Sequence, residues 1–265
     1  MAHRTPHRAV LALALLLSGC PGSGDPVGPS GDACTGRTVA IKGRVVDFET
    51  CLTQAGCQGL AGVTVSLLHN SAVASRKTAA DGTFSIDAAP DGVRMFLYVS
   101  DAGGTHAPCL QATPIDTRGQ DVFGVELFAL RQDGGLLPAI TGAAKVSLTS
   151  DVLYLGQVFR VQNASMKALP DVTVTASPAA KLRFVRCPPS FSQCKGEPTL
   201  WNAKRTTTGI FGQFLVVGSA PGDHTVLASA KQFSFPAVTA PLARGYLTIG
   251  VHQGTARPGA ADAGM

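Results

Sequence analysis

Residues 38–47 read Thr-Val-Ala-Ile-Lys-Gly-Arg-Val-Val-Asp, and this stretch decides the fold class because apolar residues recur at alternate positions. A period of two is typical of a β-strand with one buried face. Similar short apolar segments follow at 62–68, 82–86, 93–99 and 122–130, separated by turn residues. No window shows a convincing helical stripe. Short strands at this spacing predict an all-β protein built from antiparallel β-sandwiches.

The same order of segments returns in the second half of the sequence. Gly43-Arg-Val-Val corresponds to Gly156-Gln-Val-Phe, Leu60-Ala-Gly-Val-Thr-Val to Leu169-Pro-Asp-Val-Thr-Val, Gly82-Thr-Phe to Gly209-Ile-Phe, and Pro90-Asp-Gly to Pro221-Gly-Asp. Length differences fall at turns, as expected of a duplicated domain. We therefore predict two tandem seven-stranded sandwich domains at residues 36–132 and 144–253, joined by a linker at 133–143.

The first copy resembles a known family. Gly43-Arg-Val-Val-Asp, Leu60-Ala-Gly-Val-Thr-Val, Thr78-Ala-Ala-Asp-Gly-Thr-Phe-Ser and Pro90-Asp-Gly look like the carboxypeptidase regulatory-like domain. The match covers residues 38–100 well and residues 153–230 loosely, since Thr208-Gly209 replaces the Asp-Gly of the first copy. The resemblance implies a transthyretin-like sandwich, sometimes grouped with carbohydrate-binding-like folds, and a non-catalytic accessory or adhesive role. Because such domains accompany many activities, the fold names no ligand.

The N-terminus has the layout of an export signal. Arg4 and Arg8 precede an apolar run from Ala9 to Leu17, which is too short to cross a membrane as a helix. Leu17-Ser18-Gly19-Cys20 resembles the lipobox of bacterial lipoproteins. That resemblance implies a signal peptide at 1–19, cleavage before Cys20 and lipid on Cys20, which would anchor the chain to a membrane.

The residues around the predicted domains complete this organisation. Residues 20–35 combine the lipidated cysteine with a Gly- and Pro-rich stretch that predicts a flexible tether. Residues 254–265 predict a disordered tail. Pro21 stands where some bacteria use Asp as an inner-membrane retention signal, so we expect an outer-membrane location, with the membrane face left open.

Charge limits the class of partner. Loss of residues 1–19 lowers the formal net charge from +5 to +3, because Arg4 and Arg8 are removed. Nucleic-acid-binding proteins usually carry a larger and more continuous basic excess. We therefore predict no nucleic-acid partner.

Six of the seven cysteines remain once Cys20 is assigned to lipid. An even number in an exported chain predicts disulfides. Cys51 with Cys57, and Cys187 with Cys194, are close enough to close short loops, which leaves Cys34 with Cys109. Zinc would require a CxxC-type spacing with nearby histidines, and only His106 lies near a cysteine. We predict no metal and no cofactor.

One segment stands out as a contact surface. An insertion at 176–207 contains the only tryptophan, Trp201, and a cluster of cationic residues opposed by the single acid Glu197. The residues predicted to contact a partner are Trp201, Arg183, Arg186, Lys195, Lys204 and Arg205. A hairpin closed by Cys187–Cys194 would present them to a protein or a polysaccharide. The alternative is that Trp201 fills the core while the cations form a solvated face.

Motifs for catalysis are weak. Ser192-Gln-Cys-Lys195 matches Ser-x-x-Lys, but no companion motif accompanies it. Asp81 and Asp87 are too few for calcium and suit ordinary turns. The sequence therefore predicts a non-enzymatic, lipid-anchored protein of the cell envelope with a binding or structural role. A carbohydrate-binding module is the first alternative, and a hydrolase with an unrecognised site is the second.

Overall fold

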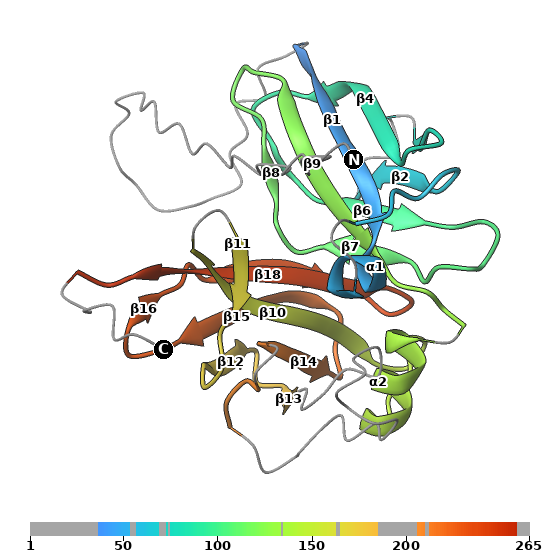
Figure 1. Ribbon diagram of the computed structural model, residues 1–265. Coiled ribbons are helices and arrows are strands. Elements are labelled where there is room, and N and C mark those ends of the chain that lie inside the picture. Colours follow the sequence, from blue (N-terminus) through green and yellow to red (C-terminus); the bar gives the residue numbers. More distant parts are fainter. Residues whose placement is uncertain are drawn as a thin grey trace, which may run out of the picture.

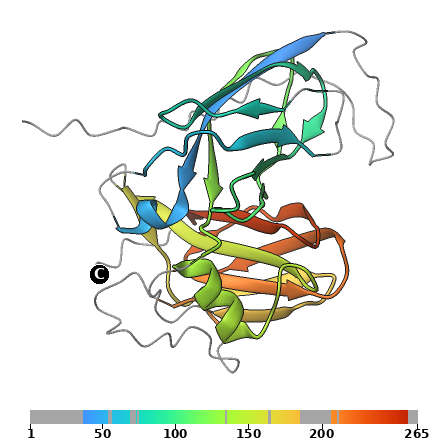
Figure 2. The same ribbon diagram turned by 90° about the vertical axis from the view of Figure 1, so that its right-hand side faces the viewer.

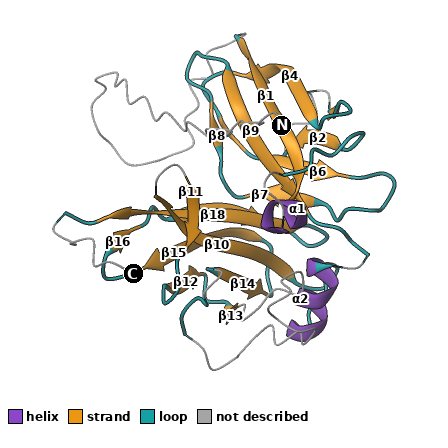
Figure 3. Ribbon diagram, viewed as in Figure 1, coloured by secondary structure: helices purple, strands orange, loops and turns teal. Residues whose placement is uncertain are grey.

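The computed structural model describes residues 37–53, 57–68, 73, 75–133, 135–162, 165–184, 206–209 and 212–258. They form a mainly β protein with several sheets, as Figures 1 and 3 show. At this level the predicted fold class is confirmed. The predicted signal peptide, Cys20 and the predicted tether lie outside the described residues.

The N-terminal half comprises residues 37–133. Its elements are β1 (Thr38–Asp47), α1 (Phe48–Thr53), β2 (Thr64–Leu67), β3 (Arg76–Lys77), β4 (Thr83–Pro90), β5 (Arg94–Met95), β6 (Leu97–Ser100), β7 (Cys109–Gln111), β8 (Ile115–Asp116) and β9 (Val122–Ala129). One sheet has the order β4-β1-β9, and β7-β6-β2-β3 runs through the sheet opposite it. Alternating residues such as Ile41, Val65 and Val99 fill the space between these sheets.

The C-terminal half comprises residues 135–258. Its elements are α2 (Leu136–Ala144), β10 (Val152–Gln162), β11 (Ser165–Ala168), β12 (Thr173–Ser177), β13 (Lys181–Phe184), β14 (Gln213–Gly218), β15 (Gly222–Ser229), β16 (Phe233–Ser234), β17 (Val238–Leu242) and β18 (Leu247–Ala256). The order β13-β14-β10-β18 lies on one side and β12-β15-β17 on the other. Tyr154, Phe214 and Val226 belong to the core between them.

The two halves share one pattern of strand pairing. β1 is antiparallel to β4 and parallel to β9, and β10 is likewise antiparallel to β14 and parallel to β18. β2 pairs with β6 as β12 pairs with β15, both antiparallel. The halves differ in the strand that follows β2 and β12: β3 pairs with β2, whereas β13 pairs with β14.

A buried threonine performs the same task in each half. Thr78 Oγ1 donates to the Leu60 carbonyl at 2.6 Å and accepts from the Val63 N–H at 3.1 Å. Thr208 Oγ1 donates to the Leu169 carbonyl at 2.8 Å and accepts from the Val172 N–H at 3.0 Å. Each threonine thereby holds the start of the Val-Thr-Val strand.

The sequence alignment of the third motif was wrong by three residues. Gly82 O accepts from Val45 N at 2.8 Å, and the group that accepts from Val158 N at 2.8 Å is Gly212 O. Gly82 therefore corresponds to Gly212 rather than to Gly209. Both glycines have positive φ, 85° and 64°, which L-residues adopt at a cost.

The halves are joined by main-chain pairing. Leu247 to Ile249 of β18 pair in parallel with Cys109 to Gln111 of β7, so the order β13-β14-β10-β18-β7-β6-β2-β3 is continuous. Figures 1 and 2 show the two halves meeting along this line.

A helix occupies the predicted linker at 133–143, which is a correction, and α1 is a second helix that the sequence pattern did not predict. Leu136, Leu137 and Ile140 of α2 pack against Leu153 and Leu215 on the face of the large sheet opposite the sandwich core. The helix forms because this face is apolar and must be covered. Its apolar stripe is too short to recognise in the sequence.

Two further predictions need correction. Cys109 carries a free, fully buried thiol, which contradicts its predicted bond to Cys34; Cys34 itself lies outside the described residues. The Cys109 Sγ instead faces the Ala107 carbonyl at 3.2 Å inside the core that α2 covers. The disordered tail predicted from residue 254 was wrong for residues 254–256, since β18 runs to Ala256 and pairs with β16; residues 259–265 lie outside the described part. The Cys51–Cys57 disulfide is confirmed.

The threonine pairs give the first prediction. Thr78→Val and Thr208→Val each leave a buried carbonyl and a buried N–H without their partner, so each should lower the free energy of unfolding by about 1–3 kcal/mol. Thr78→Ser and Thr208→Ser keep the hydroxyl and serve as matched controls. Urea denaturation measures the difference; equal stabilities of the valine and serine variants would contradict this role.

Candidate functional site

The predicted contact surface lies mostly outside the described residues. Arg186, Lys195, Trp201, Lys204, Arg205 and the Cys187–Cys194 pair are not described, so their roles stay predictions. Arg183 is half-buried in β13 and its guanidinium donates to the Leu182 carbonyl at 3.1 Å. Phe184 packs in the core opposite Phe214. The predicted hairpin was therefore wrong for residues 181–184, because these residues form β13 and extend the sheet beside β14.

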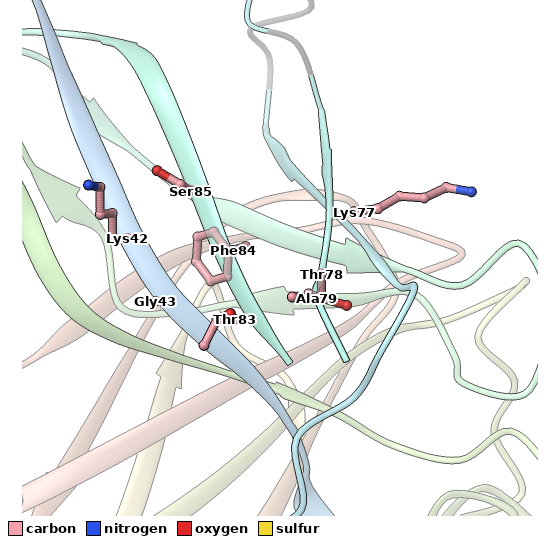
Figure 4. Close-up of a pocket in the computed structure, with 8 residues that line it drawn as sticks. All are labelled: Lys42, Gly43, Lys77, Thr78, Ala79, Thr83, Phe84 and Ser85. Atoms are coloured by element: carbon pink, nitrogen blue, oxygen red, sulfur yellow. The ribbon is translucent and has the colours of Figure 1, made fainter. Parts of the chain in front are cut away.

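A surface depression lies between β3 and β4 in the N-terminal half. β3 joins the sheet of β2 and β4 joins the sheet of β1, which leaves an open space of about 560 Å³ between them. Its lining residues are Lys42, Gly43, Lys77, Thr78, Ala79, Thr83, Phe84 and Ser85. Figure 4 shows the Phe84 ring between β1 and β4, with the segment that carries Thr78 and Ala79 on the other side of β4. The lining is an apolar floor with hydroxyls and two ammonium groups.

An exposed aromatic ring stands beside this depression. Phe123 is 66% exposed, and Lys42 Nζ lies 5.8 Å from its ring centroid. The ring points outward because β9 contains a bulge: Ile41 pairs with Val122, but Gly43 pairs with Val125. Gly124 adopts φ 71° within that bulge. Bulges redirect side chains in this way.

Sequence reasoning missed this pair of features. The signal that could have found Phe123 was a glycine inside an otherwise regular strand pattern, which often marks a bulge. The depression left no local signal, because it depends on two consecutive strands joining different sheets. Lys42 belongs to both features and makes them one continuous surface.

The turn that precedes β4 is held by the side chain of Asp81, which therefore has a structural role. Asp81 Oδ1 accepts from Thr83 N at 3.0 Å and from Thr83 Oγ1 at 2.7 Å. These bonds from Thr83, first from its N–H and then from its hydroxyl, lower the pKa of Asp81. Asp87 accepts from Ser85 Oγ. Among the described residues, no three His, Cys, Asp or Glu side chains gather as metal ligands would.

A buried polar pair joins two neighbouring strands, β10 and β18, in the core of the C-terminal half. The Tyr154 hydroxyl lies 2.7 Å from His252 Nε2, and both residues are fully buried. Gly250 makes room for the tyrosine, since a Cβ there would lie 1.8 Å from its hydroxyl. Burial lowers the pKa of His252 to about 4 and raises the pKa of Tyr154. The imidazole therefore stays neutral, and the pair cross-links β10 to β18 inside the protein.

The comparisons with known proteins are distant. The minor pilin GBS52 of Streptococcus agalactiae aligns at a TM-score of 0.27 and 10% identity, over 83% of this chain and 98% of that chain. The shaft pilin SpaA of Lactobacillus rhamnosus GG aligns at a TM-score of 0.25 and 10% identity, over 83% and 99%. TM-scores this low support no inference beyond a distant likeness between β-rich chains. No family model and no curated protein matches the sequence.

The family resemblance seen in the sequence therefore stays a prediction. In the described part of the chain, no helix is long and apolar enough to cross a membrane.

His252 gives a prediction for stability against pH. The unfolded chain takes up a proton on this histidine near pH 6.5, whereas the folded chain does so only near pH 4. The contribution of this residue to the free energy of unfolding should therefore fall by about 3 kcal/mol as pH drops through that window. His252→Gln, which does not titrate, should lose that dependence. If the free energies of unfolding of the two proteins change in the same way with pH, the assignment is refuted.

Proposed function

We propose that the protein is an exported, lipid-anchored component of the cell envelope, with a non-catalytic binding or structural role. The leader supports export and a lipid on Cys20, followed by a tether that lifts the folded part from the membrane. The Cys51–Cys57 disulfide fits an oxidising compartment. We place it at the outer membrane, since Pro21 replaces the Asp of inner-membrane retention.

The observation that carries the structural role is the continuous sheet. Pairing of β7 with β18 joins the two halves by main-chain hydrogen bonds rather than by a flexible linker. The core under α2 draws Phe48 and Leu130 from the N-terminal half and Leu153 and Ile249 from the C-terminal half. Such a joint supports a rigid body that presents its surfaces at a fixed orientation.

The shared pairing pattern also supports the proposed tandem arrangement. We retain two transthyretin-like sandwich domains at 36–132 and 144–253, with α2 added at their junction. The pattern supports duplication because two unrelated halves would rarely repeat the antiparallel and parallel neighbours of their first strand together with the same threonine contacts.

Lipidation is tested by the mass and location of the protein in its own cells. The mature chain should begin at Cys20, carry the mass of attached acyl chains and sediment with membranes. Cys20→Ser removes the thiol that accepts lipid, so this variant should lose the acyl mass and stay unprocessed or leave the membrane fraction. An unmodified Cys20 in membrane-extracted protein would contradict the anchor.

A carbohydrate-binding role is the second candidate, favoured by the exposed ring of Phe123. Flat exposed rings stack on sugar faces, and Lys42 beside the ring suits an anionic glycan. Trp201, the first choice from sequence, lies outside the described residues. Nothing in the described part of the chain adds support for a hydrolase.

Phe123→Ala should weaken binding to envelope polysaccharide about two- to tenfold, since a ring contact contributes about 0.5–1.5 kcal/mol. Binding to cell-derived exopolysaccharide and to isolated peptidoglycan would be measured by co-sedimentation. Val161→Ala, at another exposed apolar residue, is the matched control. Equal binding by the two variants would exclude Phe123 as the platform.

A further inference from the structure

The two halves differ at one sheet edge. In the C-terminal half, the edge of β14 that faces away from β10 pairs with β13. In the N-terminal half, β4 is the last strand of its sheet, and no described strand pairs with its outer edge. Because the halves otherwise repeat their pairings, no described strand fills in the N-terminal half the position that β13 fills in the C-terminal half.

The residue correspondence locates this position on β4. Gly82 corresponds to Gly212, so Phe84 corresponds to Phe214. Each phenylalanine pairs with a glycine on the neighbouring strand: Phe84 with Gly43, and Phe214 with Gly156. β13 pairs with residues 214–217, which correspond to residues 84–87 of β4. Phe184 sits opposite Phe214, so an added strand would place a side chain opposite Phe84.

The backbone of β4 is oriented to accept such a strand. Gly82 O faces β1, where it accepts from Val45 N, and Thr83 O faces the other way, where it accepts from Ala79 N at 2.8 Å. Since backbone groups alternate along a strand, the N–H and C=O of Ser85 also point away from β1. A register shift between Val39 and Ile41 then interrupts the β1–β4 ladder. The acceptor edge is therefore short.

The depression provides space for the side chain. It lies beside Phe84, Gly43 and Thr78, where the counterpart of Phe184 would sit. Two exposed lysines, Lys42 and Lys77, line it and no acid does, while the edge itself carries one acid, Asp87, which accepts from the Ser85 hydroxyl. This charge favours an acidic partner.

We propose that the outer edge of β4 binds an extended segment of a partner protein by β-strand addition. The segment runs antiparallel to β4, places an apolar side chain opposite Phe84 and carries acidic residues toward Lys42 and Lys77. Main-chain hydrogen bonds at Ser85 supply affinity, and the depression selects the side chain. The proposal adds a class of partner to the proposed binding role. It rests on that role in one respect: the partner is expected at the cell envelope.

The probe is a synthetic peptide that copies residues 180–186 with acids in place of bases, Ala-Glu-Leu-Glu-Phe-Val-Glu. The control peptide has the unchanged sequence of residues 180–186, Ala-Lys-Leu-Arg-Phe-Val-Arg. Isothermal titration with the detergent-solubilised mature protein should show saturable binding of the acidic peptide and at least fivefold weaker binding of the basic one. Hydrogen exchange should slow at residues 84–87.

Ser85→Pro removes the outward N–H without breaking the β1–β4 ladder, whereas Ser85→Ala keeps it. The proline variant should bind the acidic peptide at least tenfold more weakly than the alanine variant, with circular dichroism confirming that both fold. A second variant, Lys42→Glu with Lys77→Glu, should reverse the preference between the two peptides, and it decides the matter if the proline variant does not fold.

Equal affinities of Ser85→Pro and Ser85→Ala, or no binding of either peptide, would overturn the proposal. So would binding without protection at residues 84–87. Because these measurements do not depend on how the protein is anchored, their failure leaves lipidation of Cys20 untouched.

Discussion

The parallel pairing of β7 with β18 is the constraint on which the rest of the structure depends. β18 already pairs with β10 on its other side, so adding β7 leaves both edges of β18 occupied along Leu247–Ile249. A strand in the middle of a sheet has two faces to bury. One face packs on the sandwich core, and the other needs a separate cover, which α2 and Phe48 supply. The pairing therefore explains why a helix stands where a linker was expected. It also explains the free thiol of Cys109, which is enclosed by that same cover.

Local pattern predicted the strands well, because period-two burial is a property of neighbouring residues. The repeat was also visible, since Leu60 and Leu169 precede the matching strands β2 and β12 and donate to corresponding carbonyls, those of Val45 and Val158. The third motif was misaligned because Gly-x-Phe recurs: both Gly209 and Gly212 precede a phenylalanine by two positions. The hydrogen bond from Val158 N and the positive φ identify Gly212 as the counterpart of Gly82. Pairing of β7 with β18 had no local signal, since it joins residues far apart in the sequence.

The candidate surface was less predictable than the fold. A basic stretch with one tryptophan attracts notice in a sequence, and its described part, Lys181–Phe184, is an ordinary strand of the sheet. The depression beside Phe84 arises because β3 pairs with β2, whereas its counterpart β13 pairs with β14 in the other sheet. Short strands of similar composition can make either choice, because tertiary packing rather than propensity decides the partner. The outward ring of Phe123 depends on a bulge, for which Gly124 was the single sequence signal.

An open edge strand is a hazard as well as an opportunity, because unpaired main-chain groups template aggregation. β4 limits this hazard in three ways. Ala79 covers the edge at Thr83, a register shift interrupts the ladder after Ile86, and Pro90 closes the strand. Among the described residues, what stays unpaired is a short stretch around Ser85, with Lys42 and Lys77 beside it and the single acid Asp87 on it. An edge restricted in length and in charge favours a short acidic segment over self-association, so the features that protect the fold are the same ones that would give the site its selectivity.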